Sequence, residues 1–483
     1  MSQATTPTAR DFHTRTFPGR SFVPSSARGM DARHIDAIFL NALWSVCPNE
    51  TTASELLRKI IDTQVEGDAA ALEDFQELLE KIWFLPNRGG MGKSAPELLI
   101  SHVKLGRSYR PTFHYNLDRR VPAILSAAGI VDGSPEDTQL AHLLELASNR
   151  PMNLIEKAIF QAGEQVNPVP RPRYEGSMAL PGVVNSLSGL IKGLLGQANW
   201  ESQLSQAEAE RITLDMLAML RTSYYILWIQ IHLNALDALQ ALRESRGVPS
   251  RPRRLYFGFE TERYAAKARR FKNTRAVLET DLERGDYALM ALSQLHAVLE
   301  ARNPKWFDNW AMTNLSEDER AKVCAWFGDY SRTMQLQGLQ DAWAVPSTLP
   351  SNTAALLVLM EQALETNNRR LRPRSNQRAA YNFSWGAVPG MAVADGPRLF
   401  TNLGTGRGMG VHAMVNVDLI LLVGRSIMTH DRTALLLGIF DKLENLGILF
   451  DDETQNVVIQ ELERTGRIRK LSDAGESIYV KVD

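Results

Sequence analysis

The sequence is poor in cysteine and has no excess of charge of one sign. Of its 483 residues only Cys47 and Cys324 are cysteines. Two distant thiols form neither a disulfide framework nor a cysteine zinc site, which suits a reducing compartment. The formal net charge is −1, so the chain lacks the global basic field that dominates non-specific nucleic-acid binding. Any contact with nucleic acid must therefore come from a local concentration of positive charge.

Long apolar runs are also missing. The most apolar uncharged run, Thr222 to Leu236, is fifteen residues long and includes Gln230, His232 and Asn234. A run this short and this polar does not span a bilayer, so we expect a buried core helix there. The first thirty residues lack the apolar segment of a signal peptide. We therefore expect a cytoplasmic protein with no membrane contact.

Local signatures of catalysis and metal binding are absent from the sequence pattern. None of the nine histidines has another histidine three or four positions away, the spacing at which one helix face could hold a metal ion. There is no nucleophile elbow, and no nuclease-type cluster of carboxylates with a lysine after a strand. We therefore predict no cofactor and no metal and favour a non-enzymatic role. A site assembled from distant segments would leave no local trace, so an enzyme stays open.

Helical periodicity dominates the first 365 positions, where apolar residues recur every three or four residues. The length suits about three domains. We predict a mainly α, multi-domain protein with breaks at segments rich in Pro and Arg, such as Asn167 to Arg173. The predicted units are a flexible arm (1–30), a helical domain (31–166), a second helical domain with a long central helix (174–365), a glycine-rich mixed segment that contains strands (381–430) and a C-terminal module (431–483).

Positive charge is densest just after the second helical domain. Four arginines there stand among Asn, Ser, Gln and Pro, without a neighbouring carboxylate. Guanidinium groups form paired hydrogen bonds with phosphates and with carboxylates alike. The cluster therefore predicts a contact with DNA or with an acidic partner subunit, and the sequence leaves both open. Its members are Arg369, Arg370, Arg372 and Arg374.

A glycine-rich stretch near position 90 partly resembles a phosphate-binding loop, whose glycines, Lys and Ser cradle phosphates and bind Mg²⁺. Asn87 occupies the first glycine position of the ordinary motif, and Arg88 occupies the place of the signature lysine of its deviant form. No hydrophobic strand ending in Asp accompanies it. We favour an interhelical loop and keep nucleotide binding as the alternative. The residues concerned are Gly89, Gly90, Gly92, Lys93 and Ser94.

A second glycine-rich stretch, Gly404 to Gly410, lacks the G-x-G-x-x-G spacing, and no long helix follows it directly. We predict a hairpin loop there. The segment Val417 to Met428 after it is apolar and is a buried strand or, as we favour, a helix.

The C-terminal stretch from Asp431 has the most specific local pattern. Apolar residues three and four positions apart predict a helix over Thr433 to Leu446, which Gly447 ends. Asp452 lies three residues before Gln455, a capping-box spacing. This predicts a second helix that runs to about Thr465.

A hairpin is expected after these helices, because Ile478, Val480 and Val482 alternate with polar residues. Two helices followed by a β-hairpin form the back half of a winged helix. The preceding helix is rich in Asp and Glu, whereas a helix that enters the major groove lies among phosphates and is rarely acidic. DNA contact and protein contact therefore both stay open for the module. The basic candidates on its wing are Arg467, Arg469 and Lys470.

The segment Arg469 to Val480 reads RKLSDAGESIYV. It resembles the C-terminus of the DptG/DndG family of DNA phosphorothioation-dependent restriction subunits, in which an acidic helix and a basic strand precede a similar wing segment. The resemblance covers about a tenth of the chain. It implies a non-catalytic subunit that works beside ATPase partners in bacterial defence against unmodified DNA. It brings no catalytic residues with it.

These observations lead to one hypothesis with two alternatives. The chain is expected to be a non-catalytic subunit of a bacterial DNA-targeting defence complex, which bridges ATPase partner subunits and has DNA as a further candidate partner. The first alternative is a nucleotide-dependent enzyme that uses the Gly89–Ser94 loop. The second is a protein-interaction scaffold unrelated to DNA.

Overall fold

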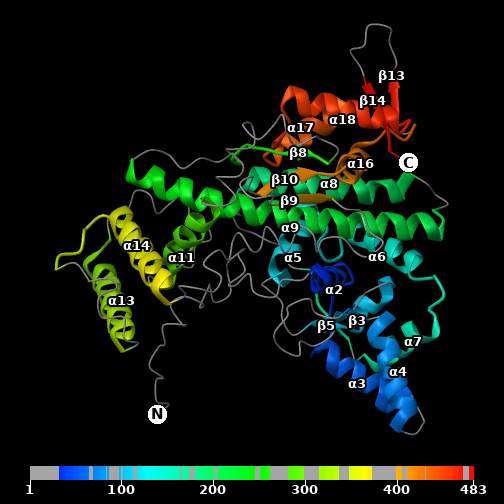
Figure 1. The fold of residues 1–483 in the computed structure, drawn as a ribbon, viewed down its shortest axis with the longest axis horizontal. Helices are drawn as coiled ribbons and strands as arrows, with labels where there is room; N and C mark the ends of the chain where they lie inside the picture. Colours follow the sequence, from blue (N-terminus) through cyan, green and yellow to red (C-terminus); the bar gives the residue numbers. More distant parts are fainter. Residues whose placement is uncertain are drawn as a thin grey trace.

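Helices make up most of the structure, which is a computed structural model (Figure 1). This confirms the mainly α fold class that the apolar spacing predicts. The residues that the structure describes are 32–64, 69–82, 84–85, 97–98, 102–111, 117–163, 166–171, 173, 180–200, 204–244, 251–260, 281–298, 315–336, 347–371, 399–404, 411–429, 431–470 and 478–482.

Two long helices, α8 (Pro181–Trp200) and α9 (Gln206–Arg243), lie side by side at the centre of the molecule (Figure 1). The 38 residues of α9 give it a length of about 57 Å. From Asp215 to Leu236 every side chain that the structure describes is buried, because α2, α6, α8, α11, α14 and α16 pack around the helix. The buried core helix predicted over Thr222 to Leu236 is therefore confirmed.

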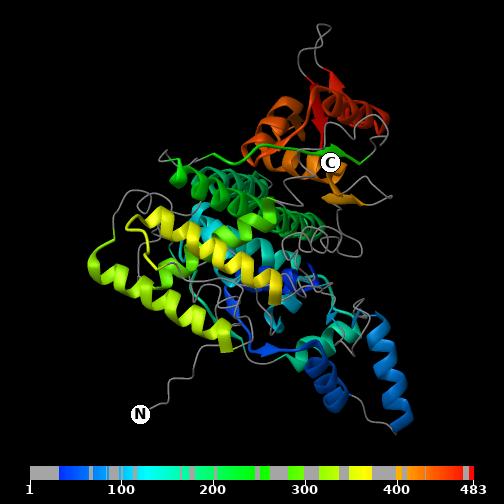
Figure 2. The same cartoon turned by 60° about the vertical axis from the view of Figure 1, so that its left-hand side comes forward.

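The N-terminal helices lie on one side of the α8–α9 layer, and the C-terminal module lies on the other, in both ribbon views (Figures 1 and 2). Part of the N-terminal region has its own small apolar cluster, in which Leu56 and Ile60 of α3 meet Ile159 of α7. The elements are α2 (Ala32–Leu43), α3 (Ala53–Gln64), α4 (Ala69–Ile82), the 3-10 helix η1 (Val103–Arg107), α5 (Leu117–Ala127), α6 (Pro135–Ala147) and α7 (Leu154–Ala162).

Three two-residue strand pairs and the buried side chain of Arg171 hold the loops of this region together. The segment predicted as a Pro- and Arg-rich linker is fixed in place within its described part, because Arg171 is only 8% exposed. Its guanidinium group donates to the Leu43 carbonyl and faces Asp137, and burial lowers the pKa of Arg171 to about 10. The pairs are β1 (Val46–Cys47) with β6 (Asn167–Pro168), β2 (Glu50–Thr51) with β5 (Arg110–Pro111), and β3 (Phe84–Leu85) with β4 (Glu97–Leu98).

A group of three helices extends α9 at its C-terminal end: α11 (Leu282–Val298), α13 (Glu317–Leu336) and α14 (Thr353–Leu371). Trp326 stacks on Tyr330 in α13, with ring centroids 5.0 Å apart. The Tyr330 hydroxyl donates to the Ala363 carbonyl of α14 at 3.1 Å. The hydrogen bond of Tyr330 joins the outer helix α13 to α14.

The glycine-rich part of the chain forms a hairpin, as predicted. Strand β9 (Phe400–Gly404) pairs antiparallel with β10 (Val411–Val415) across residues 405–410, which lie outside the described residues. A distant strand, β8 (Gly258–Phe259), joins β10 on its other edge in a parallel register. Its neighbour β7 (Leu255–Tyr256) pairs with β12 (Ile448–Leu449). Residues 255–259 therefore contribute strands to two different sheets.

From here on, the C-terminal module means residues 417–482, which adds α16 to the predicted unit that begins at residue 431. It begins with α16 (Val417–Ile427), which confirms the helix favoured for this segment. The predicted two helices and terminal hairpin follow, and a third strand completes an antiparallel sheet in the order β11-β14-β13. The elements are β11 (Thr433–Leu435), α17 (Leu436–Asn445), β12, α18 (Asp452–Arg464), β13 (Ile468–Lys470) and β14 (Ile478–Lys481).

Two details of the module differ from the prediction. Residues Thr433 to Leu435 form strand β11 instead of the first helical turn, because they pair with β14. The cap of α18 is Asp451, whose carboxylate accepts the Thr454 backbone N–H at 2.8 Å, so Asp452 already lies inside the helix. Gly447 and Gly466 have positive φ after the two helices, as expected for helix-ending glycines.

One main hydrophobic core runs through most of the described elements, from Ile38 in α2 to Val482 at the end of the chain. The helices of the predicted units 31–166 and 174–365 and of the C-terminal module thus contribute to the same core, while the domain boundaries themselves stay a prediction. In the part of the chain that the structure describes, no helix has both the length and the apolar character needed to cross a bilayer.

Candidate functional site

The register of the terminal sheet places apolar and basic side chains together. Leu435 of β11 pairs with Tyr479 of β14, and Tyr479 pairs with Arg469 of β13. In the next row Ala434 and Val480 are buried. Since side chains alternate between the two faces of a sheet, the row from Leu435 to Arg469 lies on the face turned away from the core.

The basic side chains of this face come from both arms of the hairpin. Arg467 lies two residues before Arg469, and its carbonyl accepts the backbone N–H of Lys481 at 2.7 Å. The alternation therefore puts Arg467, Arg469 and Lys481 on the same side. We define the sheet face as Leu435, Arg467, Arg469, Tyr479 and Lys481.

The carboxylate of Asp431 lies beside the sheet face. Asp431 is 3.5 Å from the Arg469 guanidinium group, and both side chains are about half exposed. Its carboxylate accepts hydrogen bonds from the hydroxyls of Thr429 and Thr433, and these lower the pKa of Asp431; the charge of Arg469 lowers it further. Asp431 is therefore charged near neutral pH and offsets part of the positive charge of the face.

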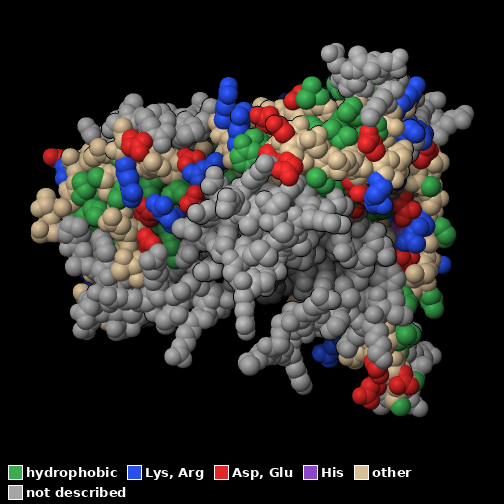
Figure 3. Space-filling model, turned by 45° about the horizontal axis from the view of Figure 1, so that its top comes forward, with side chains coloured by type: hydrophobic (Ala, Val, Ile, Leu, Met, Phe, Trp, Pro, Cys, Tyr) green, Lys and Arg blue, Asp and Glu red, His purple; other side chains and the backbone are tan. Residues whose placement is uncertain are grey.

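The exposed face of α18 has the opposite sign. Its amphipathic spacing buries Val458 and Leu462. Among the exposed residues three carboxylates accompany one arginine, and Arg464 already pairs with Glu461, with Nε and Oε2 2.9 Å apart. We define the α18 face as Asp452, Glu453, Asn456, Gln460, Glu463 and Arg464. On the side of the molecule drawn in Figure 3, acidic and basic side chains are interspersed over the described residues, so neither sign dominates that view.

A buried ion pair fixes the module on the body of the protein. Arg425 of α16 contacts Asp215 of α9 with two nitrogens, at 2.7 and 2.8 Å. The Gln197 side chain of α8 donates to the Arg425 carbonyl. At Gly193 an added Cβ would overlap the Ser426 carbonyl, so α8 and α16 cross closely only because residue 193 is glycine. Asp215 is 7% exposed and Arg425 13%.

Residues 251–260 join the module to the body at a second place. Their backbone pairs with β12 of the module and with β10, the strand that immediately precedes the module. Arg253 lies between the carboxylates of Asp237 and Asp281, and its backbone exchanges two hydrogen bonds of 2.9 Å with the Gln230 side chain. Gly447 contacts this point with a φ of +84°, where a Cβ would meet Gln230 and Arg253. The position of the module is therefore set from two sides.

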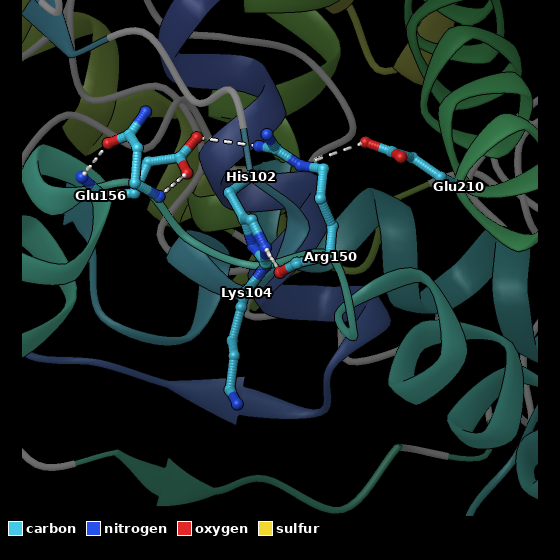
Figure 4. A network of polar contacts seen from close by, with 6 residues as sticks. His102, Lys104, Arg150, Glu156 and Glu210 are labelled. Carbon is cyan, nitrogen blue, oxygen red and sulfur yellow. Dashed lines mark hydrogen bonds and ion pairs between the residues drawn. The ribbon is translucent and has the colours of Figure 1, made fainter. Parts of the chain in front are cut away.

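A second polar network lies between the N-terminal helices and α9 (Figure 4). The Arg150 side chain reaches Glu156 at 2.8 Å and Glu210 of α9 at 3.6 Å. His102 binds the Arg150 carbonyl with Nε2 at 2.8 Å, and its Nδ1 accepts the Lys104 N–H, which caps η1. The Nδ1 atom therefore carries no proton, and the network joins η1, α7 and α9 structurally.

A groove of about 630 Å³ runs along α13. Small residues such as Cys324 and Gly328 line its middle. Arg320 and Arg332 lie near its ends, twelve residues apart, which corresponds to about 18 Å along a helix. Arg332 also pairs with Asp329 at 3.5 Å. The two arginines therefore cannot hold one small anion together.

Many of the sequence-predicted site residues lie outside the part of the chain that the structure describes. The nucleotide-loop candidates Gly89, Gly90, Gly92, Lys93 and Ser94 all do, and so do Arg372 and Arg374. Arg369 and Arg370 belong to the last turn of α14, and their side chains are outside the description. The predictions for these residues stay predictions.

The wing candidates are described in part. Arg467 is half-buried and Arg469 is exposed, on the sheet face. Lys470 lies in β13, where it pairs with Ile478, and its side chain is outside the described part. Within the described residues, no group of His, Cys, Asp and Glu is arranged to hold a metal ion.

Sequence reasoning missed the contribution of Leu435 to the sheet face. Leu435 is 39% exposed, and the next residue but one, Leu437, is 63% exposed. The helical spacing assigned Leu435 to a helix, so its position opposite Tyr479 could not be expected. No family model matches the chain, and no curated protein matches it either.

Proposed function

We infer that the chain is a non-catalytic subunit of a bacterial DNA-targeting defence complex, in which the helical body binds ATPase partner subunits and the C-terminal module contacts DNA. One observation carries this proposal. The module combines the strand and helix order expected of a winged helix with a basic outer sheet face. The order is α16, β11, α17, α18, β13, β14, with β14 between β11 and β13.

The way the module is attached supports a bridging role. Asp215 and Arg425 join it to the longest helix of the body, and residues 251–260 hold it from a second side. A partner subunit bound to the body and DNA bound to the module would thus be held in a defined relative position. The resemblance of Arg469 to Val480 to the DptG/DndG family points to the same class of complex.

Reconstitution tests the proposal. The full-length chain is co-expressed with the products of its neighbouring genes and analysed by size-exclusion chromatography. We expect co-elution with ATPase subunits and no ATP hydrolysis by the chain alone. ATP hydrolysis by the isolated chain that is lost in Lys93→Ala would overturn the proposal in favour of a nucleotide-dependent enzyme. Full cellular function of the chain without its neighbours would also contradict it.

A protein-interaction scaffold that needs no DNA is the second candidate. It is favoured by the α18 face, whose exposed side chains are mainly acidic or uncharged, and by the exposed Leu437. A helix with this charge suits a basic protein surface better than a phosphate backbone. The reconstituted complex decides between the two. Assembly without DNA binding at any salt concentration would favour the scaffold.

A further inference from the structure

We propose that the sheet face binds single-stranded DNA, with phosphates on Arg467, Arg469 and Lys481 and a base stacked on Tyr479. This inference deepens the proposed function, because it names the form of DNA and the surface that binds it. It rests on the strand register, which places Leu435 beside Tyr479, although the two are far apart in the sequence, and Tyr479 beside Arg469 of the same hairpin.

Charge complementarity selects a polyanion for this face. The sheet face carries three basic side chains, and Asp431 pairs with one of them, Arg469, at 3.5 Å. The basic residues lie on two strands whose axes are about 5 Å apart. Successive phosphates of an extended strand can therefore contact both strands of the hairpin. Arg469 and Lys481 are exposed, so their charged groups are accessible to such a chain.

The apolar residues of the sheet face favour a nucleic acid whose bases are exposed. Aromatic side chains between basic residues form the stacking platforms of proteins that bind single strands without sequence preference. Tyr479 is half-buried and lies between Leu435 and Arg469 in the same row of the sheet. Leu435, the last residue of β11, is 39% exposed and adds apolar surface to the row. A duplex keeps its bases stacked inside and would leave these apolar residues unused.

In a winged helix the helix before the hairpin usually reads the duplex. In this module that helix is α18, and its charge does not favour a duplex. The α18 face carries three carboxylates and one arginine, and α18 also packs against β8. A helix that enters the major groove meets phosphates on both sides, which would repel Asp452, Glu453 and Glu463. The α18 face is therefore unsuited to reading a duplex, whereas the sheet face offers a surface for a single strand.

Fluorescence anisotropy with the full-length chain tests this inference. The probes are a labelled oligothymidylate of about 20 nucleotides, long enough to cover a site of 4–16 nucleotides, and a duplex of the same length. The charge variant Arg469→Glu/Lys481→Glu is compared with Lys442→Glu/Arg464→Glu, which makes the same change in net charge elsewhere on the module. Tyr479→Ala is compared with Tyr479→Phe, which keeps the ring.

We expect tighter binding of the single strand than of the duplex. The Arg469→Glu/Lys481→Glu variant should weaken it at least about tenfold and reduce the slope of log affinity against log salt by about 1.4, from two lost phosphate contacts. Tyr479→Ala should weaken it about tenfold and Tyr479→Phe less than about twofold. Matched melting curves for the variants separate lost binding from lost folding.

Three results would overturn the inference. Equal binding of duplex and single strand, unaffected by Tyr479→Ala, would mean a contact with phosphates alone. Equal losses in the two charge variants would mean a non-specific effect of net charge. Absence of DNA binding, together with loss of a partner subunit from the reconstituted complex in Arg469→Glu/Lys481→Glu, would identify an acidic protein as the occupant. Co-elution with ATPase subunits is measured separately, so it can succeed or fail independently of these results.

Discussion

The sheet face and the α18 face belong to the same small module and differ in almost every property that governs binding. The sheet face carries Arg467, Arg469 and Lys481 around a tyrosine, whereas the α18 face carries Asp452, Glu453 and Glu463 on a helix. The chain as a whole has a net charge of −1, and this value does not show that charge of each sign is concentrated on a separate face. Strand register and helix periodicity separate the two signs of charge and so determine which partner each face suits.

The comparison depends first on the hairpin being docked on the helices. Deleting residues 467–483 removes Val480 and Val482, which are almost completely buried. Burial of each side chain contributes about 1.5–3 kcal/mol, so the deletion should lower the free energy of unfolding by roughly 3–6 kcal/mol. Thermal unfolding and limited proteolysis measure this. An unchanged melting temperature and digestion pattern would show that the hairpin is not docked, and the sheet face would lose its basis.

The comparison also assumes that both faces are presented by one fixed module. Arg425→Ala would leave Asp215 buried without its two-nitrogen partner, although Arg211 remains 3.3 Å away. We expect a loss of about 3 kcal/mol in the free energy of unfolding, because the buried carboxylate of Asp215 would lose its main partner. Chemical denaturation measures it. The double variant Asp215→Asn/Arg425→Met is the control, and it should be more stable than Arg425→Ala. Equal stability of Arg425→Ala and wild type would contradict the role of this ion pair.

Neutralising the α18 face sharpens the comparison. In Asp452→Asn/Glu453→Gln/Glu463→Gln the affinity for single-stranded DNA should change less than about twofold, because screened charges on another face contribute little at physiological salt. Anisotropy titrations with both forms of DNA measure this. A gain of tenfold or more for the duplex would mean that α18 approaches DNA, and the assignment of the two faces would be wrong.

The smallest expected effect is the contribution of Asp431 to stability, which depends on pH. Because hydrogen bonds from Thr429 and Thr433 lower its pKa below the ordinary value of 3.8, its contribution to stability is present above that value and is lost as the pH falls through the folded-state pKa. The advantage in melting temperature of wild type over Asp431→Asn should therefore shrink on acidification from about pH 5 to pH 3. The same variant should bind single-stranded DNA slightly more tightly at neutral pH. A constant difference in melting temperature would contradict the role of this carboxylate.

Local patterns predicted what depends on local spacing. The core helix α9, the helix α16, the β9–β10 hairpin and the helix-ending glycines Gly447 and Gly466 all follow from residues close together in the sequence. The sequence also predicts the acidic character of α18, because its acidic residues lie close together in the sequence.

Long-range pairing could not be predicted in the same way. Thr433 to Leu435 fit a helical pattern, and only their partners in β14 make them a strand. The ion pair of Asp215 with Arg425 joins residues 210 positions apart, and the network around Arg150 joins η1, α7 and α9. The segment 251–260 shows the same limit, because its two strands pair with β10 and β12, which are far away in the sequence. The row of Leu435, Tyr479 and Arg469 depends on such pairing.

Photo-cross-linking tests the central claim most directly, because it identifies the residues that contact DNA. Single-stranded DNA containing 5-iodo-deoxyuridine is irradiated with the full-length protein, and the cross-linked peptides are identified by mass spectrometry. The account predicts a cross-link at Tyr479, lost in Tyr479→Ala and competed by unlabelled single strands. Cross-links confined to residues 452–464, or to residues 369–374, would contradict it, because the contact would then belong to α18 or to the arginine cluster.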